Sequence, residues 1–230
     1  ASTPVDFVVT HDSGHAIVLS TGGGRLTAVN LATGAIVMQN PMAGLFNAVS
    51  ISPTGSIYLT GQYTLHEFSP KPPFDLVGYS KFLPSPGKLH FTPDGRYALA
   101  INAQAATYSL ALLDTTIPGG NDTGAPTSMG LSNAIFVYIN NVVARPTRID
   151  MRGNNSAMLY FAEEGRFYNL PFPTGAATEA TFSNVGTVTD VRSSALSDEY
   201  PSGRTLYYTT AGGLLTKLDT AGSAYPATTL

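Results

Sequence analysis

The sequence predicts an all-β fold, a β-propeller of about five four-stranded blades. Short runs rich in Val, Ile, Tyr, Phe and Thr recur along the whole chain, and almost no segment has the apolar spacing of an amphipathic helix. Turn signals separate these runs at a fairly even pitch. One kind of hairpin recurs, and a third strand follows each copy, with a fourth strand in most copies. Four strands in a repeat of about 40 to 45 residues are typical of a propeller blade.

The recurring hairpin has a short apolar strand, a turn and a more hydrophobic strand. Its copies span residues 6–20, 48–61, 88–102, 147–163 and 190–210. The turn glycines of the first three, Gly14, Gly55 and Gly95, lie 41 and 40 positions apart (55 − 14 and 95 − 55). In the third copy, KLHFTPDGRYALAIN, Asp94 and Gly95 are preferred residues for a tight turn that needs positive φ. We therefore predict a structural role for Asp94.

The remaining strands complete each repeat. We predict third strands at 25–34, 63–71, 107–116, 166–175 and 214–222, and fourth strands at 35–41, 75–83, 134–144 and 180–189. The third repeat carries an insertion at 117–133 that is rich in Gly and Pro, which predicts a surface loop. The prediction is one domain, 1–230, with blades at about 4–47, 48–87, 88–145, 146–189 and 190–230.

Closure of the propeller is not predicted by the pattern, because the fifth repeat runs out early in its fourth strand. Four architectures are open: a loosely closed five-bladed ring, a fragment of a longer propeller, an open arc completed by another chain, and tandem sandwiches. An unpaired edge strand tends to pair with another chain. We favour an incomplete or open propeller, either the fragment or the arc.

Two hairpins, SPTG with SIYLTG and FTPDGRYALAIN, resemble the first hairpin of the YVTN, or surface-layer and lactonase-like, class of seven-bladed β-propellers. The strands at 26–34, 110–116 and 215–222 match the strand that follows it in that class. The resemblance covers most of the chain. It implies the repeat architecture and no particular activity, because propellers of unrelated function share the motif.

Composition excludes several classes of function. The net charge is −3 and no basic run could follow a phosphate backbone, so we expect no nucleic-acid partner. The absence of Cys rules out disulfides, thiolate metal sites and cysteine catalysis. Apolar stretches are far shorter than the ~20 residues that cross a bilayer. Only 12% of residues are charged and the chain starts at Ala1 without Met, which favours a mature extracellular or periplasmic protein over a trimmed chain.

Charged residues on the predicted first strands are the main candidates for a ligand site. First strands converge on the axis of a propeller, and alternation along a strand puts every second side chain on one face. The candidates for the mouth of the channel are Lys88, His90, Arg148, Asp150, Asp190 and Arg192. In the alternative interpretation, which we favour, Arg148–Asp190 and Asp150–Arg192 are ion pairs between blades.

Other candidates carry less weight. His11 and His15 flank the first hairpin turn, where their spacing has no metal-binding geometry. Glu163 and Glu164 are adjacent and point to opposite faces of a strand. Asn121 and Asn154 satisfy the acceptor pattern for N-glycosylation in predicted loops. We predict no metal and no cofactor.

The leading hypothesis is a non-enzymatic, secreted or cell-surface interaction module. It would bind protein or glycan, or self-associate through an open strand edge. The alternative is a lactonase-like or glycoside-hydrolase enzyme, which requires Asp6, His90, Asp150 and Asp190 to converge at the central channel. A redox-cofactor propeller is a third hypothesis, but the chain has no Trp and so lacks the Trp-rich blades expected of quinoproteins.

Overall fold

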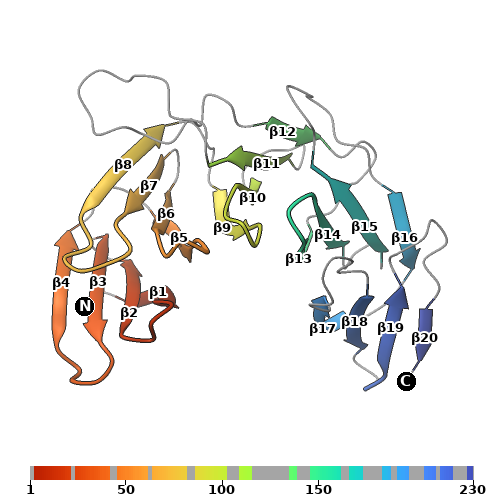
Figure 1. Cartoon of the computed structure of the whole chain (residues 1–230), viewed down its shortest axis with the longest axis horizontal. Helices are drawn as coiled ribbons and strands as arrows, with labels where there is room; N and C mark the ends of the chain where they lie inside the picture. The colour runs from red at the N-terminus through yellow and green to blue at the C-terminus, as the bar shows by residue number, and fades with distance from the viewer. Residues whose placement is uncertain are drawn as a thin grey trace. The chain divides into compact units, whose positions relative to one another are not determined.

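The described secondary structure consists of β-strands, arranged in five antiparallel sheets of four strands each (Figure 1). The structure is a computed structural model. It describes residues 3–21, 24–41, 46–61, 64–81, 86–102, 109–115, 135–138, 146–161, 166–172, 183–187, 191–196, 205–210, 213–219 and 227–229. In each sheet, strands that follow one another in the sequence lie side by side.

The first three sheets correspond to the first three predicted repeats. The first sheet contains β1 (Thr3–Val9), β2 (His15–Thr21), β3 (Arg25–Asn30) and β4 (Ile36–Pro41). The second contains β5 (Phe46–Ile51), β6 (Ile57–Gly61), β7 (Thr64–Phe68) and β8 (Leu76–Lys81). The third contains β9 (Pro86–Phe91), β10 (Tyr97–Asn102), β11 (Ser109–Asp114) and β12 (Ile135–Tyr138).

The last two sheets have the same plan. The fourth sheet contains β13 (Arg148–Arg152), β14 (Ser156–Phe161), β15 (Arg166–Pro171) and β16 (Ser183–Thr187). The fifth contains β17 (Val191–Leu196), β18 (Thr205–Thr210), β19 (Leu215–Asp219) and β20 (Ala227–Thr229). The sequence pattern did not predict a full fourth strand there, yet β20 pairs with β19. By their contacts, the residues of the chain form two compact units, Ala1–Ala134 and Ile135–Leu230.

The hairpin turns explain why the first strands end where they do. Thr92 closes the third hairpin: its N–H donates to the Tyr97 carbonyl, and its hydroxyl donates to the Asp94 carboxylate at 2.6 Å. The same carboxylate oxygen accepts the N–H of Arg96 at 3.0 Å, and Gly95 has a φ of +73°. Asp94 is therefore part of the turn, as its Asp-Gly chemistry predicted.

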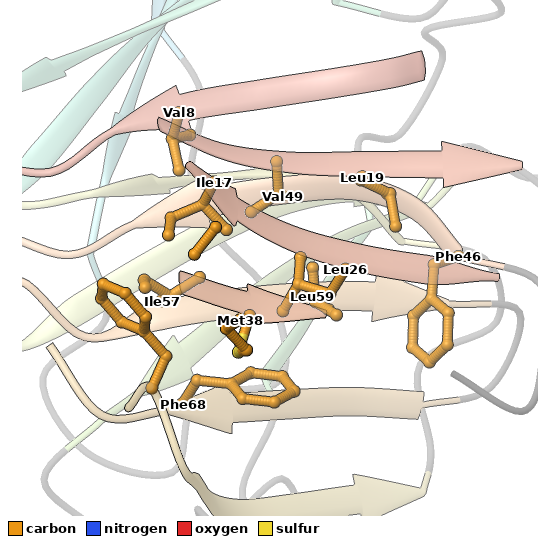
Figure 2. Packing of buried hydrophobic residues seen from close by; sticks show 12 residues of the cluster. Val8, Ile17, Leu19, Leu26, Met38, Phe46, Val49, Ile57, Leu59 and Phe68 are labelled. Carbon is orange, nitrogen blue, oxygen red and sulfur yellow. The ribbon is translucent and has the colours of Figure 1, made fainter. Parts of the chain in front are cut away.

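The core of the first unit lies between the first and second sheets (Figure 2). Alternation puts apolar side chains on one face of the first sheet, where Val8, Ile17, Ala28 and Met38 form a single row of cross-strand neighbours. The second sheet meets this face with buried apolar side chains from β5, β6, β7 and the turn after β7: Phe46, Val49, Ile57, Leu59, Phe68 and Phe74. Sheets of this unit therefore stack face to face, as propeller blades do.

Candidate functional site

The first strands of the first three sheets lie next to one another, with β5 in contact with both β1 and β9. Asp6 on β1 joins them. One carboxylate oxygen of Asp6 lies 3.2 Å from the Lys88 ammonium on β9, and the other accepts the backbone N–H of Val49 on β5 at 3.1 Å. The first oxygen also accepts the N–H of Phe7 at 2.9 Å. Of the two side chains, Asp6 is 23% exposed and Lys88 is 47% exposed.

This geometry gives Asp6 and Lys88 a structural task. A carboxylate that accepts three donors from three strands holds those strands in register, and its charge is offset by the ammonium group. The pair is partly exposed, so its Coulombic contribution is screened by solvent. Lys88 is one of the predicted channel residues, and its partner in the structure is Asp6 of the first sheet, a pair that the sequence analysis did not propose.

The other predicted channel residues are spread over both units. His90 lies on β9 opposite Leu99. Arg148 and Asp150 lie two residues apart on β13. β13 and β17 are in contact, which brings Asp150 and Arg192 onto neighbouring strands of the second unit. Asp190 lies outside the described residues, and so does the side chain of Arg192, so the proposed pairs Arg148–Asp190 and Asp150–Arg192 stay predictions.

The two histidines of the first hairpin have separate structural contacts. The His11 ring lies 2.7 Å, Nε2 to O, from the Ser52 carbonyl in the second hairpin turn. The His15 ring packs edge-on against Phe74, with ring centroids 5.4 Å apart. Between them, Asp12 accepts hydrogen bonds from Thr10 and from the N–H of Gly14, and these bonds lower the pKa of its carboxyl group. His11 and His15 thus contribute to contacts between the turns and to packing.

A polar pocket lies where the second and third hairpin turns meet. It has a volume of about 270 Å³ and combines residues of the second sheet with the Asp94 turn and the end of β11. We call it the turn pocket and define it by its lining residues: Ser52, Thr54, Ser56, Tyr58, Glu67, Asp94, Gly95, Arg96 and Thr115. Five of these nine carry a hydroxyl group, two carry a carboxylate and one carries a guanidinium.

Tyr58 and Glu67 form the inner part of the turn pocket. They are directly opposite each other on β6 and β7, and the Tyr58 hydroxyl donates to the Glu67 carboxylate at 2.9 Å. The Tyr58 ring is buried and packs against Phe91 of the third sheet, with centroids 5.1 Å apart. Burial, reinforced by the Glu67 charge, raises the pKa of Tyr58 far above its ordinary value. Tyr58 is therefore a permanent donor, and it fixes the orientation of the Glu67 carboxylate.

The opposite wall comes from the third hairpin. The Thr115 hydroxyl donates to the Gly95 carbonyl at 2.6 Å, which ties the end of β11 to the turn. The Arg96 guanidinium lies over the Tyr97 ring, 5.0 Å from its centroid. On the facing wall the Ser52 and Thr54 hydroxyls are 2.8 Å apart. The pocket thus has preformed donors and acceptors on both sides.

Sequence reasoning did not identify the turn pocket. Asp94 was recognised as a turn residue, but Tyr58, Glu67 and Arg96 were not considered. No local sequence signal marks the pair, because it is the β6–β7 register that places Tyr58 opposite Glu67. Of the glycosylation candidates, Asn154 is exposed in the turn between β13 and β14, whereas Asn121 lies outside the described residues.

Two kinds of feature are absent from the described residues. No group of three or more His, Cys, Asp or Glu side chains among them is arranged to hold a metal ion. No helix in the same part of the chain has the length and apolar character needed to cross a membrane.

Comparison with known proteins adds information on the fold. No protein-family model matches the chain, and no curated protein matches it in sequence. Solved structures do match. The dihydro-heme d1 dehydrogenase NirN in complex with DHE is 14% identical with a TM-score of 0.63, and the match covers 97% of this chain and 45% of that one.

Two further matches have similar scores. A catalytically inactive virginiamycin B lyase from Staphylococcus aureus with quinupristin is 13% identical, with a TM-score of 0.61 over 100% of this chain and 70% of that one. A candidate 6-phosphogluconolactonase from Bacteroides fragilis is 15% identical, with a TM-score of 0.62 over 96% of this chain and 68% of that one. The chain thus spans between about half and two thirds of these structures. At such identities the likeness establishes a β-propeller-like fold alone.

Proposed function

We propose that this chain is a binding module that recognises a glycan in the turn pocket. The observation that carries the proposal is the lining of the pocket: hydroxyl groups dominate it, and two carboxylates and one guanidinium lie among them. Sugar hydroxyls each donate and accept, so they pair with surfaces that offer both roles within a small space. Ser, Thr and Tyr hydroxyls offer both, the carboxylates accept, and the guanidinium donates in a planar fork.

The size and shape of the pocket support a small polar ligand. At about 270 Å³ it is near the lower end of ligand sites, which suits a single sugar ring with the rest of a chain extending into solvent. Glu67 is the central group, because Tyr58 holds its carboxylate in place. A carboxylate fixed in this way accepts from two neighbouring sugar hydroxyls without losing side-chain freedom on binding.

The location that suits this function is outside the cytoplasm, and we propose that the module is secreted or held at the cell surface. The support is its composition, with only 12% charged residues. The resemblance of its hairpins to the YVTN, or surface-layer, class supports the same location. Catalysis at a central channel has less support. Asp6, one of the four residues required, accepts a hydrogen bond from the Val49 N–H and forms an ion pair with Lys88.

The first prediction tests the pocket. Binding to a glycan array should identify a sugar, and titration calorimetry with the free mono- or disaccharide should give its affinity. Glu67→Gln should weaken binding about 10-fold, because a hydrogen bond to a charged acceptor contributes about 1.5–3 kcal/mol and a neutral one less. Arg96→Ala should also weaken it.

The matched control is Arg25→Ala, which removes the same exposed charge from the first sheet, away from the pocket. It should leave the affinity unchanged. Thermal unfolding of each variant separates lost binding from lost structure. An array without any bound sugar, or an affinity that Glu67→Gln leaves intact, would refute the assignment of glycan binding to this pocket.

A further inference from the structure

The position of Glu67 can be compared between the three sheets of the first unit, because each sheet begins with the same kind of hairpin. Equivalent positions are counted from the residues whose N–H groups close the hairpins: Thr10, Ser52 and Thr92. The second cross-strand pair from these residues places the following side chains on the second strands: Ile17, Tyr58 and Leu99. Their partners on the third strands are Ala28, Glu67 and Leu112. Glu67 therefore occupies the same place in its sheet as Ala28 and Leu112 do in theirs.

The equivalent pairs in the first and third sheets belong to the core. All four of their side chains are aliphatic and at most 1% exposed. In the second sheet the same place holds Tyr58 and Glu67, of which Tyr58 packs against Phe91 and Glu67 lines the turn pocket. Taking a carboxylate out of water costs free energy, and an aliphatic side chain fills this position in the two neighbouring sheets. The fold alone therefore does not account for Glu67.

The rest of this row in the second sheet is also polar or small. From β5 to β8 the row consists of Ser50, Tyr58, Glu67 and Gly78. The equivalent row of the first sheet is apolar and packs in the core (Figure 2): Val8, Ile17, Ala28 and Met38. The Ser50 hydroxyl accepts the Leu89 N–H of the third sheet at 2.8 Å, and Gly78 has no side chain to cover the carboxylate from β8. The second sheet thus turns a polar row toward the third sheet, with Glu67 in it.

The charge of Glu67 has a neutral partner. Its carboxylate accepts the Tyr58 hydroxyl at 2.9 Å, and this donor carries no charge. The guanidinium of the pocket belongs to Arg96, an exposed residue at the rim whose side chain lies over the Tyr97 ring. The lining as a whole has two carboxylates and one guanidinium. The inner part of the pocket is therefore negative and suits a positively charged hydrogen-bond donor.

We propose that the turn pocket selects sugars with a free amino group, and that Glu67 binds the ammonium group. This inference rests on the proposed glycan-binding function and adds the chemical class of the sugar. An ammonium group donates three hydrogen bonds and carries a positive charge, whereas a sugar hydroxyl donates one and is neutral. Hydrogen bonds between charged groups are roughly twice as strong as neutral ones. A sugar with a carboxylate of its own would instead meet the like charge of Glu67.

The second prediction compares matched sugars by titration calorimetry with the full chain. Each hexosamine is paired with the hexose of the same configuration, in the gluco, galacto and manno series, at about pH 6, where amines are protonated. In the series that the pocket accepts, the hexosamine should bind about 10-fold more tightly than the hexose, because its ammonium group forms a charge-assisted bond. The N-acetylated hexosamine has no charge and should lose this advantage.

The variant Glu67→Gln isolates the role of the charge. Its amide keeps an oxygen that accepts from Tyr58, so the variant should fold, which thermal unfolding checks. The preference for hexosamine over hexose should fall from about 10-fold to about 1-fold, because the ammonium group then meets a neutral acceptor. The matched control is Asp75→Asn, which removes an exposed carboxylate from the turn before β8, outside the lining of the pocket. At an ionic strength of about 0.15 M distant charges are screened, and the control should keep the preference.

Failure of this inference is distinguishable from failure of the proposed function. Hexoses that bind as tightly as their hexosamines would leave a sugar-binding pocket and overturn the selection for amines. A preference that persists in Glu67→Gln, or that disappears equally in Asp75→Asn, would overturn the role of Glu67 and indicate a general effect of charge. Binding of neither kind of sugar in any series would overturn both proposals.

Discussion

Single residues in the first unit connect strands that are far apart in the sequence. The Asp6 carboxylate accepts from Val49 and lies against Lys88, so it couples three first strands through one side chain. His11 makes a comparable link between the first two hairpin turns through the Ser52 carbonyl. The sequence predicted charged residues on these strands, but it could not predict their partners, because these depend on how the sheets stack.

His66 is the residue from which we predict a pH effect. Its ring lies edge-on to Phe46 with centroids 5.1 Å apart, and burial lowers its pKa below the usual value of 6.5. Below about pH 6.5 the unfolded chain therefore binds a proton at His66 that the folded chain resists, so stability is lost as the pH falls through this range. Urea unfolding at pH 7.5 and pH 5 should show this loss.

The His66→Gln variant identifies the source of the effect. Glutamine does not titrate, so the fall in unfolding free energy between the two pH values should become smaller than in the wild type. Asp12 has a lowered pKa as well, but a carboxyl group titrates at lower pH and does not contribute in this window. Equal pH dependence in the wild type and His66→Gln would contradict the assignment.

At the scale of the element, the hairpin was the part of the fold that the sequence predicted best. Apolar alternation and turn residues such as Asp94 and Gly95 act locally, so each hairpin was identified from its own residues. The turn pocket was missed for the opposite reason. It needs the β6–β7 register, which places Tyr58 opposite Glu67, and the approach of two turns that are about 40 residues apart in the sequence.

The third hairpin allows a direct test of its turn chemistry. Asp94→Ala removes an acceptor that receives the Thr92 hydroxyl and the Arg96 N–H, and it should lower the free energy of unfolding by about 1–2 kcal/mol. Asp94→Asn keeps a side-chain oxygen at the same place and should retain most of this stability. The measurement is urea unfolding at neutral pH. Equal stability of Asp94→Ala and the wild type would mean that the carboxylate does not organise the turn.

At the scale of the whole molecule, the repeat was predictable and its closure was not. The sequence predicted five four-stranded repeats, and five such sheets are present. How a propeller closes depends on which sheet packs against its first sheet. Apolar residues such as Phe7 do not encode this, because the same residue type suits any neighbouring sheet.

The two compact units lead to a prediction about cooperativity. In stacked repeats each sheet is stabilised by its neighbours, so the loss of a core side chain spreads first to the sheets it contacts. Leu59 and Leu159 are both 0% exposed, one in each unit, and replacing either by Ala should cost about 3 kcal/mol. Native-state hydrogen exchange should then show Leu59→Ala lowering protection mainly within Ala1–Ala134, and Leu159→Ala mainly within Ile135–Leu230. Protection lost equally in both units in either variant would show instead that the whole chain unfolds as one cooperative body.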